Sequence, residues 1–63
     1  MPLYTVPQVA EILNVRELHV RNLIGAGELL AVDVSVGSAP RYRITQAELD
    51  RFITSRSTQV QHV

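Results

Sequence analysis

The side chains best suited to chemistry in this chain are its arginines. Lysine is absent, so all six basic side chains are arginines: Arg16, Arg21, Arg41, Arg43, Arg51 and Arg56. A guanidinium presents a planar fork of N–H donors that matches phosphate oxygens and the edge of guanine. Genomic base composition can also favour arginine over lysine, so the residue type alone leaves two explanations open. The distribution of the arginines over the fold must decide between them.

Other reactive residue types are sparse. The chain has no cysteine, which excludes disulfides, cysteine-based zinc sites and thiol chemistry. The two histidines, His19 and His62, lie far apart, and no nucleophile, base or pair of acids has a catalytic arrangement. The glycines at 25–27 end an expected helix and do not begin one, so they form no phosphate-binding loop. We therefore expect the protein not to be an enzyme and to bind neither a metal ion nor a cofactor.

The length of the chain limits what it can build. Sixty-three residues make one domain, and a hydrophobic fraction of 46% is too high for a disordered segment. A domain this small buries only ~60% of its unfolded surface, which argues against a deep substrate pocket. No secretion signal and no run of ~20 apolar residues is present. The sequence predicts a cytoplasmic domain with no membrane partner and no small-molecule substrate.

A first helix is predicted over residues 6–13. Thr5 and Gln8 have the spacing of a capping box, in which each side chain bonds the other residue's backbone N–H. Pro7 falls in the first turn, where its missing N–H costs nothing. Apolar residues follow at helical intervals, and Tyr4 is expected to pack against their side of the helix.

A second helix is predicted over residues 17–26. Asn14 tolerates the left-handed backbone that a tight turn between helices needs, and Gly27 suits the position just after the second helix. Val20 and Leu23 lie on the apolar side of this helix. Two short helices joined by so few residues indicate a helix-turn-helix unit.

From Leu30 onward the apolar period changes from ~3.6 residues to two, which predicts a β-hairpin. In the first strand, alternate residues point to opposite faces: Val32, Val34 and Val36 against Asp33 and Ser35. Residues 37–40 form the turn. The returning strand places Tyr42 and Ile44 toward the core and Arg41 and Arg43 outward.

A third helix is predicted over residues 46–55. Thr45 and Glu48 have the spacing of a second capping box. Residues 56–63 are polar and lack periodicity, so they are expected to form a loose C-terminal tail. The folded domain is therefore expected to span residues 1–55.

Four segments in this order resemble the small excisionase and MerR-like winged helix-turn-helix domains: YTVPQVAEILNV, HVRNLIGAGEL, RYRI and TQAELDRFI. The resemblance runs from Leu3 to about Ile53. It implies a small α+β fold in the order helix, helix, hairpin, helix, with double-stranded DNA as the partner. The second helix would enter the major groove, and the hairpin, or wing, would reach the adjacent minor groove or the backbone.

The resemblance also implies which residues touch DNA. They are Arg16, Glu17, His19, Arg21 and Asn22 on the second helix, and Ser38, Arg41 and Arg43 on the wing. Stand-alone domains of this length resemble excisionases, also called recombination directionality factors. These proteins bind several adjacent sites, bend the DNA and help an integrase to excise a phage or mobile element. Other members act as small transcription regulators.

Bulk charge leaves alternatives open. Six acidic residues balance the six arginines, whereas DNA-binding domains are usually basic. A neutral chain suits a protein-interaction module that uses the winged fold without DNA. The polar residues of the second helix could form a solvated face, and Arg41 and Arg43 could pair with Asp33 across the hairpin. The expected interface nevertheless carries four arginines against one acid, Glu17, a local charge of +3.

A few residues bear on the interface individually. The chain departs from the usual family residues at four positions: Arg16, Glu17, Leu30 and Asp33. Glu17 could accept a hydrogen bond from cytosine N4. Tyr42 and Phe52 are predicted to belong to the core, with base stacking as the alternative. Leu18 is predicted to face outward, where it could touch a thymine methyl.

Overall fold

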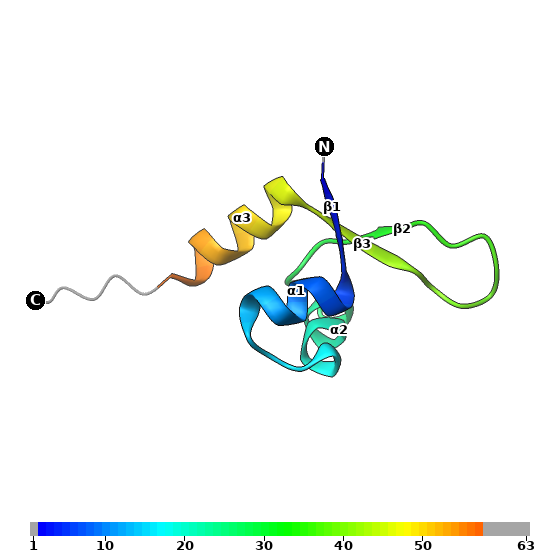
Figure 1. Ribbon diagram of the computed structural model, residues 1–63, viewed down its shortest axis with the longest axis horizontal. Coiled ribbons are helices and arrows are strands. Elements are labelled where there is room, and N and C mark those ends of the chain that lie inside the picture. Colours follow the sequence, from blue (N-terminus) through cyan, green and yellow to red (C-terminus); the bar gives the residue numbers. More distant parts are fainter. Residues whose placement is uncertain (1, 58–63) are drawn as a thin grey trace, which may run out of the picture.

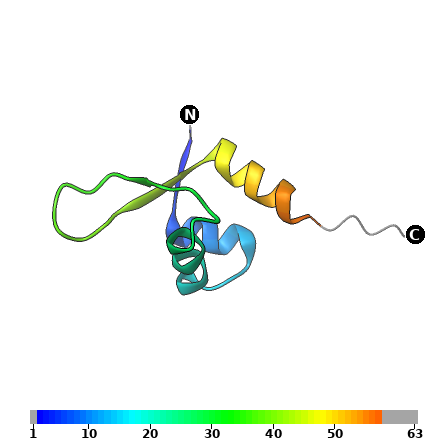
Figure 2. The same cartoon turned by 180° about the vertical axis from the view of Figure 1, so that it is seen from behind.

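The computed structural model describes residues 2–57. Of the tail expected over residues 56–63, residues 58–63 lie outside the described residues, and His62 is one of them. The elements follow in the order β1 (Leu3–Thr5), α1 (Val6–Leu13), α2 (Glu17–Gly25), β2 (Val32–Asp33), β3 (Tyr42–Thr45) and α3 (Gln46–Arg56). Figures 1 and 2 show α1 and α2 on one side of the small sheet, with the wing loop and α3 projecting in opposite directions. The architecture is a winged helix-turn-helix, as the sequence predicts.

The beginning of α1 confirms the predicted capping box. The Thr5 N–H donates to Gln8 Oε1 at 2.9 Å, and the Gln8 N–H donates to Thr5 Oγ1 at 3.2 Å. The helix ends at Asn14, whose φ of 58° is left-handed. Both ends of α1 are therefore determined by local sequence.

The end of α2 is equally local. Gly27 has a φ of 77°, a conformation that costs glycine little. The N–H of Glu28 donates to the Leu23 carbonyl at 2.9 Å, and the N–H of Gly27 donates to the Ile24 carbonyl at 3.0 Å. These two bonds form the Schellman motif that satisfies the last carbonyls of a helix. At the other end, Arg16 is the N-cap residue and its side chain makes no capping bond.

Strand β1 was not predicted. It pairs antiparallel with β3, which also pairs with β2, so the sheet order is β1-β3-β2. Tyr4 sits opposite Ile44 in this pairing, packs against the core and donates a hydrogen bond from its hydroxyl to the Gln46 side chain. Three residues are too few to show an alternating pattern, so this strand exists because β3 offers it a partner.

The core lies between the helices and one face of β3. Its buried side chains come from every helix, from β3 and from the segment after α2: Val6, Val9, Ala10, Val20, Leu23, Leu29, Ile44, Leu49 and Phe52. Fully burying a side chain of the Val, Leu, Ile or Phe type contributes ~1.5–3 kcal/mol. Phe52 is only 6% exposed, and Tyr42 packs on the cluster from its edge. Both aromatic residues are core residues, as predicted, and not a stacking platform.

The first strand of the hairpin is shorter than its valine pattern suggests. Strand β2 contains only two residues, and Val32 pairs with Arg43. Residues directly opposite each other in an antiparallel pair project to the same face. Val32 therefore shares the outward face with Arg43, and it is 50% exposed.

A polar cluster fastens α3 to the segment after α2. Glu48 Oε2 accepts the Leu30 N–H at 3.0 Å, and Glu48 Oε1 accepts from Arg51 Nε at 2.8 Å. Arg51 also donates to the Glu28 carbonyl at 3.2 Å. The Glu48 N–H donates to Thr45 Oγ1, but the Glu48 carboxylate faces Leu30 and Arg51, so only half of the second capping box forms. The cluster holds the exit of α2 against α3.

This cluster predicts a loss of stability in acid. The Arg51 side chain, and then the Leu30 N–H, lower the pKa of Glu48 to about 2 from an ordinary value of 4.5. A carboxyl whose pKa is lowered by folding stabilises the fold above its unfolded pKa, and this contribution disappears as the pH falls through its folded pKa. We expect the free energy of unfolding to fall between about pH 4.5 and pH 2.

Glu48→Gln tests this expectation through urea unfolding at a series of pH values. The variant should be less stable than the wild type at neutral pH and should lose less stability over the acid range. Glu11→Gln is the matched control, because Glu11 is exposed on α1 and makes no side-chain hydrogen bond or ion pair within residues 2–57. Parallel stability curves for the wild type and Glu48→Gln would contradict the assignment.

Candidate nucleic-acid interface

The structure divides the six arginines into two groups. The two on α3 have acidic partners: Arg51 pairs with Glu48, and Arg56 pairs with Glu28. The Arg56 guanidinium also lies 5.0 Å from the centre of the Phe52 ring. Within residues 2–57 the other four make no ion pair: Arg16, Arg21, Arg41 and Arg43. These four are the ones that the sequence assigned to DNA.

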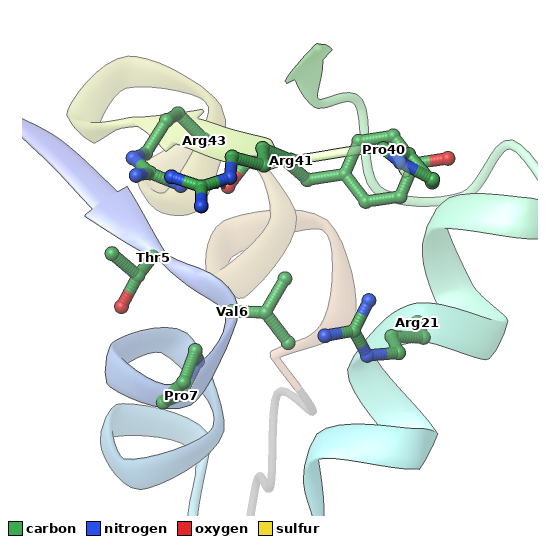
Figure 3. Close-up of a pocket in the computed structure, with 8 residues that line it drawn as sticks. Thr5, Val6, Pro7, Arg21, Pro40, Arg41 and Arg43 are labelled. Atoms are coloured by element: carbon green, nitrogen blue, oxygen red, sulfur yellow. Dashed lines mark hydrogen bonds between the residues drawn. The ribbon is translucent and has the colours of Figure 1, made fainter. Parts of the chain in front are cut away.

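Three of the unpaired arginines line one open groove of about 300 Å³, here named the arginine groove. Arg21 enters it from α2, and Arg41 and Arg43 enter it from β3 and the residue before it. Figure 3 shows the Arg21 guanidinium reaching toward Val6, with the other two guanidiniums on the opposite wall above Thr5. Three positive charges from distant parts of the sequence therefore face a single space that a phosphate can enter.

The start of α1 forms the floor of the arginine groove but contributes little charge. A helix N-terminus attracts anions through its free N–H groups. Here the capping box already uses the N–H groups of Thr5 and Gln8, and Pro7 has none. Most of the attraction for an anion therefore comes from the arginines.

The alternative pairing of the wing arginines with Asp33 is wrong. Asp33 sits opposite Tyr42 in the sheet, and Val32 sits opposite Arg43. Because side chains alternate along a strand, Asp33 projects to the face opposite the two arginines. Its Oδ1 accepts backbone N–H groups from Ser35 and Arg41 at 2.9 and 3.3 Å, and not a guanidinium.

A second groove lies at the start of α2. It encloses about 360 Å³, and its lining is Val15, Arg16, Leu18, His19 and Asn22. Leu18 is 67% exposed, as the sequence predicts, and lies among polar residues that can bond to base edges. Glu17 is exposed in the first turn of α2 and lines neither groove. The groove thus combines hydrogen-bonding groups with an apolar contact.

The sequence placed Arg21, His19 and Asn22 together among the DNA-contacting residues of the second helix, and the structure separates them. His19 and Asn22 line the groove at the start of α2, whereas Arg21 lines the arginine groove with the wing residues. Neighbouring positions on a helix point about 100° apart, so adjacent residues can serve different surfaces. Arg21 therefore lies in the same groove as the wing arginines and not in the groove at the start of α2.

The third predicted wing residue, Ser38, lies in the loop between the strands. It lines a concavity of about 520 Å³ together with Arg41 and Arg43. The Val36 side chain, at the tip of the wing, is completely exposed. The sequence did not identify Thr5, Pro7 and Pro40 as lining of the arginine groove. Thr5 lies there because β1 pairs with β3 and sets Thr5 opposite Arg43, and local sequence does not reveal this pairing.

Comparison with known proteins agrees with this geometry. A family model described as a helix-turn-helix domain matches residues 3–57, so the chain belongs to that family. The family includes excisionase-like small DNA-binding proteins and is typically non-enzymatic. The search of curated proteins and the search of solved structures each returned no match. Helix-turn-helix domains bind DNA by placing their second helix in the major groove.

Two further observations concern the described part of the chain. Among residues 2–57, no cluster of His, Cys, Asp and Glu is arranged to hold a metal ion. None of the helices there is long and apolar enough to cross a membrane.

The arginine groove predicts the effect of Arg21→Ala. Loss of a phosphate contact should weaken binding equally on all DNA sequences and reduce the log–log salt slope by ~1. The free energy of unfolding should change by only about 0.5 kcal/mol, because Arg21 is exposed. Fluorescence anisotropy over a range of salt concentrations measures the slope.

Arg56→Gln is the control for this experiment, because it removes one positive charge at the far end of α3. Its salt slope should match that of the wild type. If Arg21→Ala instead weakens binding to one sequence only and leaves the slope unchanged, Arg21 reads a base and the phosphate assignment is wrong.

Proposed function

We propose that the protein is a sequence-specific DNA-binding protein of the excisionase type. It would bind adjacent sites on double-stranded DNA, bend the duplex and assist an integrase in excising a phage or mobile element. Its place would be the cytoplasm of a bacterial host, on the DNA. The observation that carries this proposal is a set of four arginines on a helix-turn-helix fold that have no acidic partner within residues 2–57: Arg16, Arg21, Arg41 and Arg43.

In this proposal α2 reads base edges through the groove at its start. Arg16 and Asn22 have the side-chain chemistry for guanine and adenine respectively, and Glu17 can accept from cytosine N4. Leu18 supplies an apolar contact for a thymine methyl. His19 lines the same groove and completes the set of candidate base-reading residues.

The arginine groove would hold the sugar–phosphate backbone beside the major groove. Arg21, Arg41 and Arg43 face the same space, and a guanidinium can bind phosphate through two parallel N–H donors. The wing loop, with Ser38, continues from this groove toward the adjacent minor groove. Phosphate contacts of this kind fix the register of a protein on DNA while the bases specify the sequence.

A single copy should bind weakly. The chain has no net charge, and four arginines allow a salt slope of only about −3 to −4. A single module of this kind buries ~600–1,000 Å² on DNA. Stable occupancy then requires several copies on adjacent sites, each contacting its neighbour. The exposed wing tip around Val36 could contact the first helix or the C-terminal residues of the next copy.

Two other functions share parts of this description. A small transcription regulator is the alternative that the family resemblance leaves open, and it would use the same DNA-binding surface. A protein-interaction module would fit the neutral net charge. The first differs from an excisionase in how it assembles on DNA, and the second would show no salt-dependent binding.

Binding to tandem sites tests the assembly. We expect a monomer in free solution and an affinity per site that rises when one, two and three sites are placed in tandem. A head-to-tail contact leaves open ends, so the array should extend along the duplex, and bending should increase with each added copy. Sedimentation, gel shift and a bending assay measure these quantities.

Equal affinity per site across the series would contradict the array. A tight symmetric dimer in the absence of DNA would favour a conventional dimeric repressor instead. A salt slope near zero would favour the protein-interaction module.

A further inference from the structure

Asp33 is an acidic residue at the base of a wing whose other charged side chains are arginines. It ends β2, and both residues of that strand are exposed. An exposed carboxylate at this place would be expected either to pair with an arginine or to repel a phosphate. The structure supports neither role, because Asp33 projects to the face of the hairpin opposite Arg41 and Arg43.

The carboxylate instead holds the two ends of the wing loop together. Its Oδ1 accepts the N–H of Ser35, where the loop begins, at 2.9 Å, and the N–H of Arg41, where the loop ends, at 3.3 Å. In the same place the Val34 N–H donates to the Arg41 carbonyl at 2.8 Å. A regular antiparallel pair exchanges two such bonds, and here Asp33 takes the Arg41 N–H that would complete the exchange.

The same contacts favour the charged form of Asp33. Hydrogen bonds from Ser35, first from its side chain and then from its backbone, and from the Arg41 N–H lower the pKa of the Asp33 carboxyl. A charged carboxylate accepts stronger hydrogen bonds than a neutral acid, so the charge strengthens the bonds to both N–H groups. The backbone of Arg41 is held from two directions, through its N–H and through its carbonyl.

We propose that Asp33 is a positioning residue for DNA binding: its carboxylate fixes the backbone at Arg41, so that the Arg41 guanidinium stays in the arginine groove with Arg21 and Arg43. The inference rests on the proposed DNA-binding function and adds a residue that does not itself touch DNA. Arg41 borders both the arginine groove and the concavity of the wing loop. If its backbone were free, the guanidinium would divide its time between these two spaces.

Removal of the carboxylate distinguishes positioning from repulsion, because the two effects have opposite signs. If Asp33 only repels phosphates, Asp33→Ala should tighten binding. If Asp33 positions Arg41, Asp33→Ala should weaken binding ~3–10-fold and reduce the salt slope by ~1, although the chain has become more positive.

The experiment uses the full chain and a fluorescently labelled, mixed-sequence DNA duplex, with anisotropy measured over a range of salt concentrations. Asp33→Asn keeps an acceptor oxygen and removes the charge, so it should retain most of the wild-type affinity and slope. Glu11→Ala removes a negative charge from the exposed side of α1 and should not weaken binding. Urea unfolding confirms that each variant is folded. If Asp33→Ala is unfolded, Asp33→Asn still separates the two roles: repulsion alone predicts that it binds more tightly than the wild type, and positioning predicts that it does not.

A double-variant cycle tests the route of the effect. In an Arg41→Ala background, Asp33→Ala should have no further effect on affinity, because the guanidinium that it positions is gone. If the wild type binds DNA and Asp33→Ala binds equally well or more tightly, the positioning role is wrong and the proposed function stands. The same conclusion follows if Asp33→Ala still weakens binding in the Arg41→Ala background. A wild-type protein that binds no duplex at any salt concentration would overturn the proposed function as well.

Discussion

The central strand β3 is the element on which both the fold and the proposed interface depend. One face of the strand carries Ile44, which is fully buried, and Tyr42, which packs on the core. The other face carries Arg43, and Arg41 follows the same alternation just before the strand. Because β3 pairs with β1 on one side and β2 on the other, its faces are fixed and a shift of one residue would exchange core and surface. Burial of Ile44 therefore also directs the arginines outward.

A neutral chain can still present a positive surface, because its charges are sorted in space. The acids Glu28 and Glu48 lie at the junction of α2 and α3, where they pair with Arg56 and Arg51. The acid of the wing, Asp33, is satisfied by backbone N–H groups on the face away from the arginines. In the described part of the chain, the remaining arginines are thus left without acidic partners. Exposed ion pairs contribute only ~0–1 kcal/mol each, so this sorting matters more for where charge is available than for stability.

Local sequence predicted the helices well, because capping residues mark the beginning of α1 and α3 and left-handed residues mark the ends of α1 and α2. Thr5 and Thr45 cap α1 and α3, and Asn14 and Gly27 adopt the expected left-handed backbone. Strand β1 forms only by pairing with β3, and the face on which Val32 lies is set by pairing with the same strand. No local sequence pattern encodes either pairing. The set of DNA-binding residues stays a prediction. Its division between two grooves could not be predicted from the sequence, because it depends on how α2 packs beside the wing.

We propose that the arginines without acidic partners among residues 2–57 face DNA, whereas those on α3 do not. Nuclear magnetic resonance of the arginine Nε–Hε groups, recorded while duplex DNA is added, tests it residue by residue. We expect the signals of Arg51 and Arg56 to stay in place. The signals of the other four arginines should shift or broaden: Arg16, Arg21, Arg41 and Arg43. Changes confined to Arg51 and Arg56, with the other four unaffected, would contradict it.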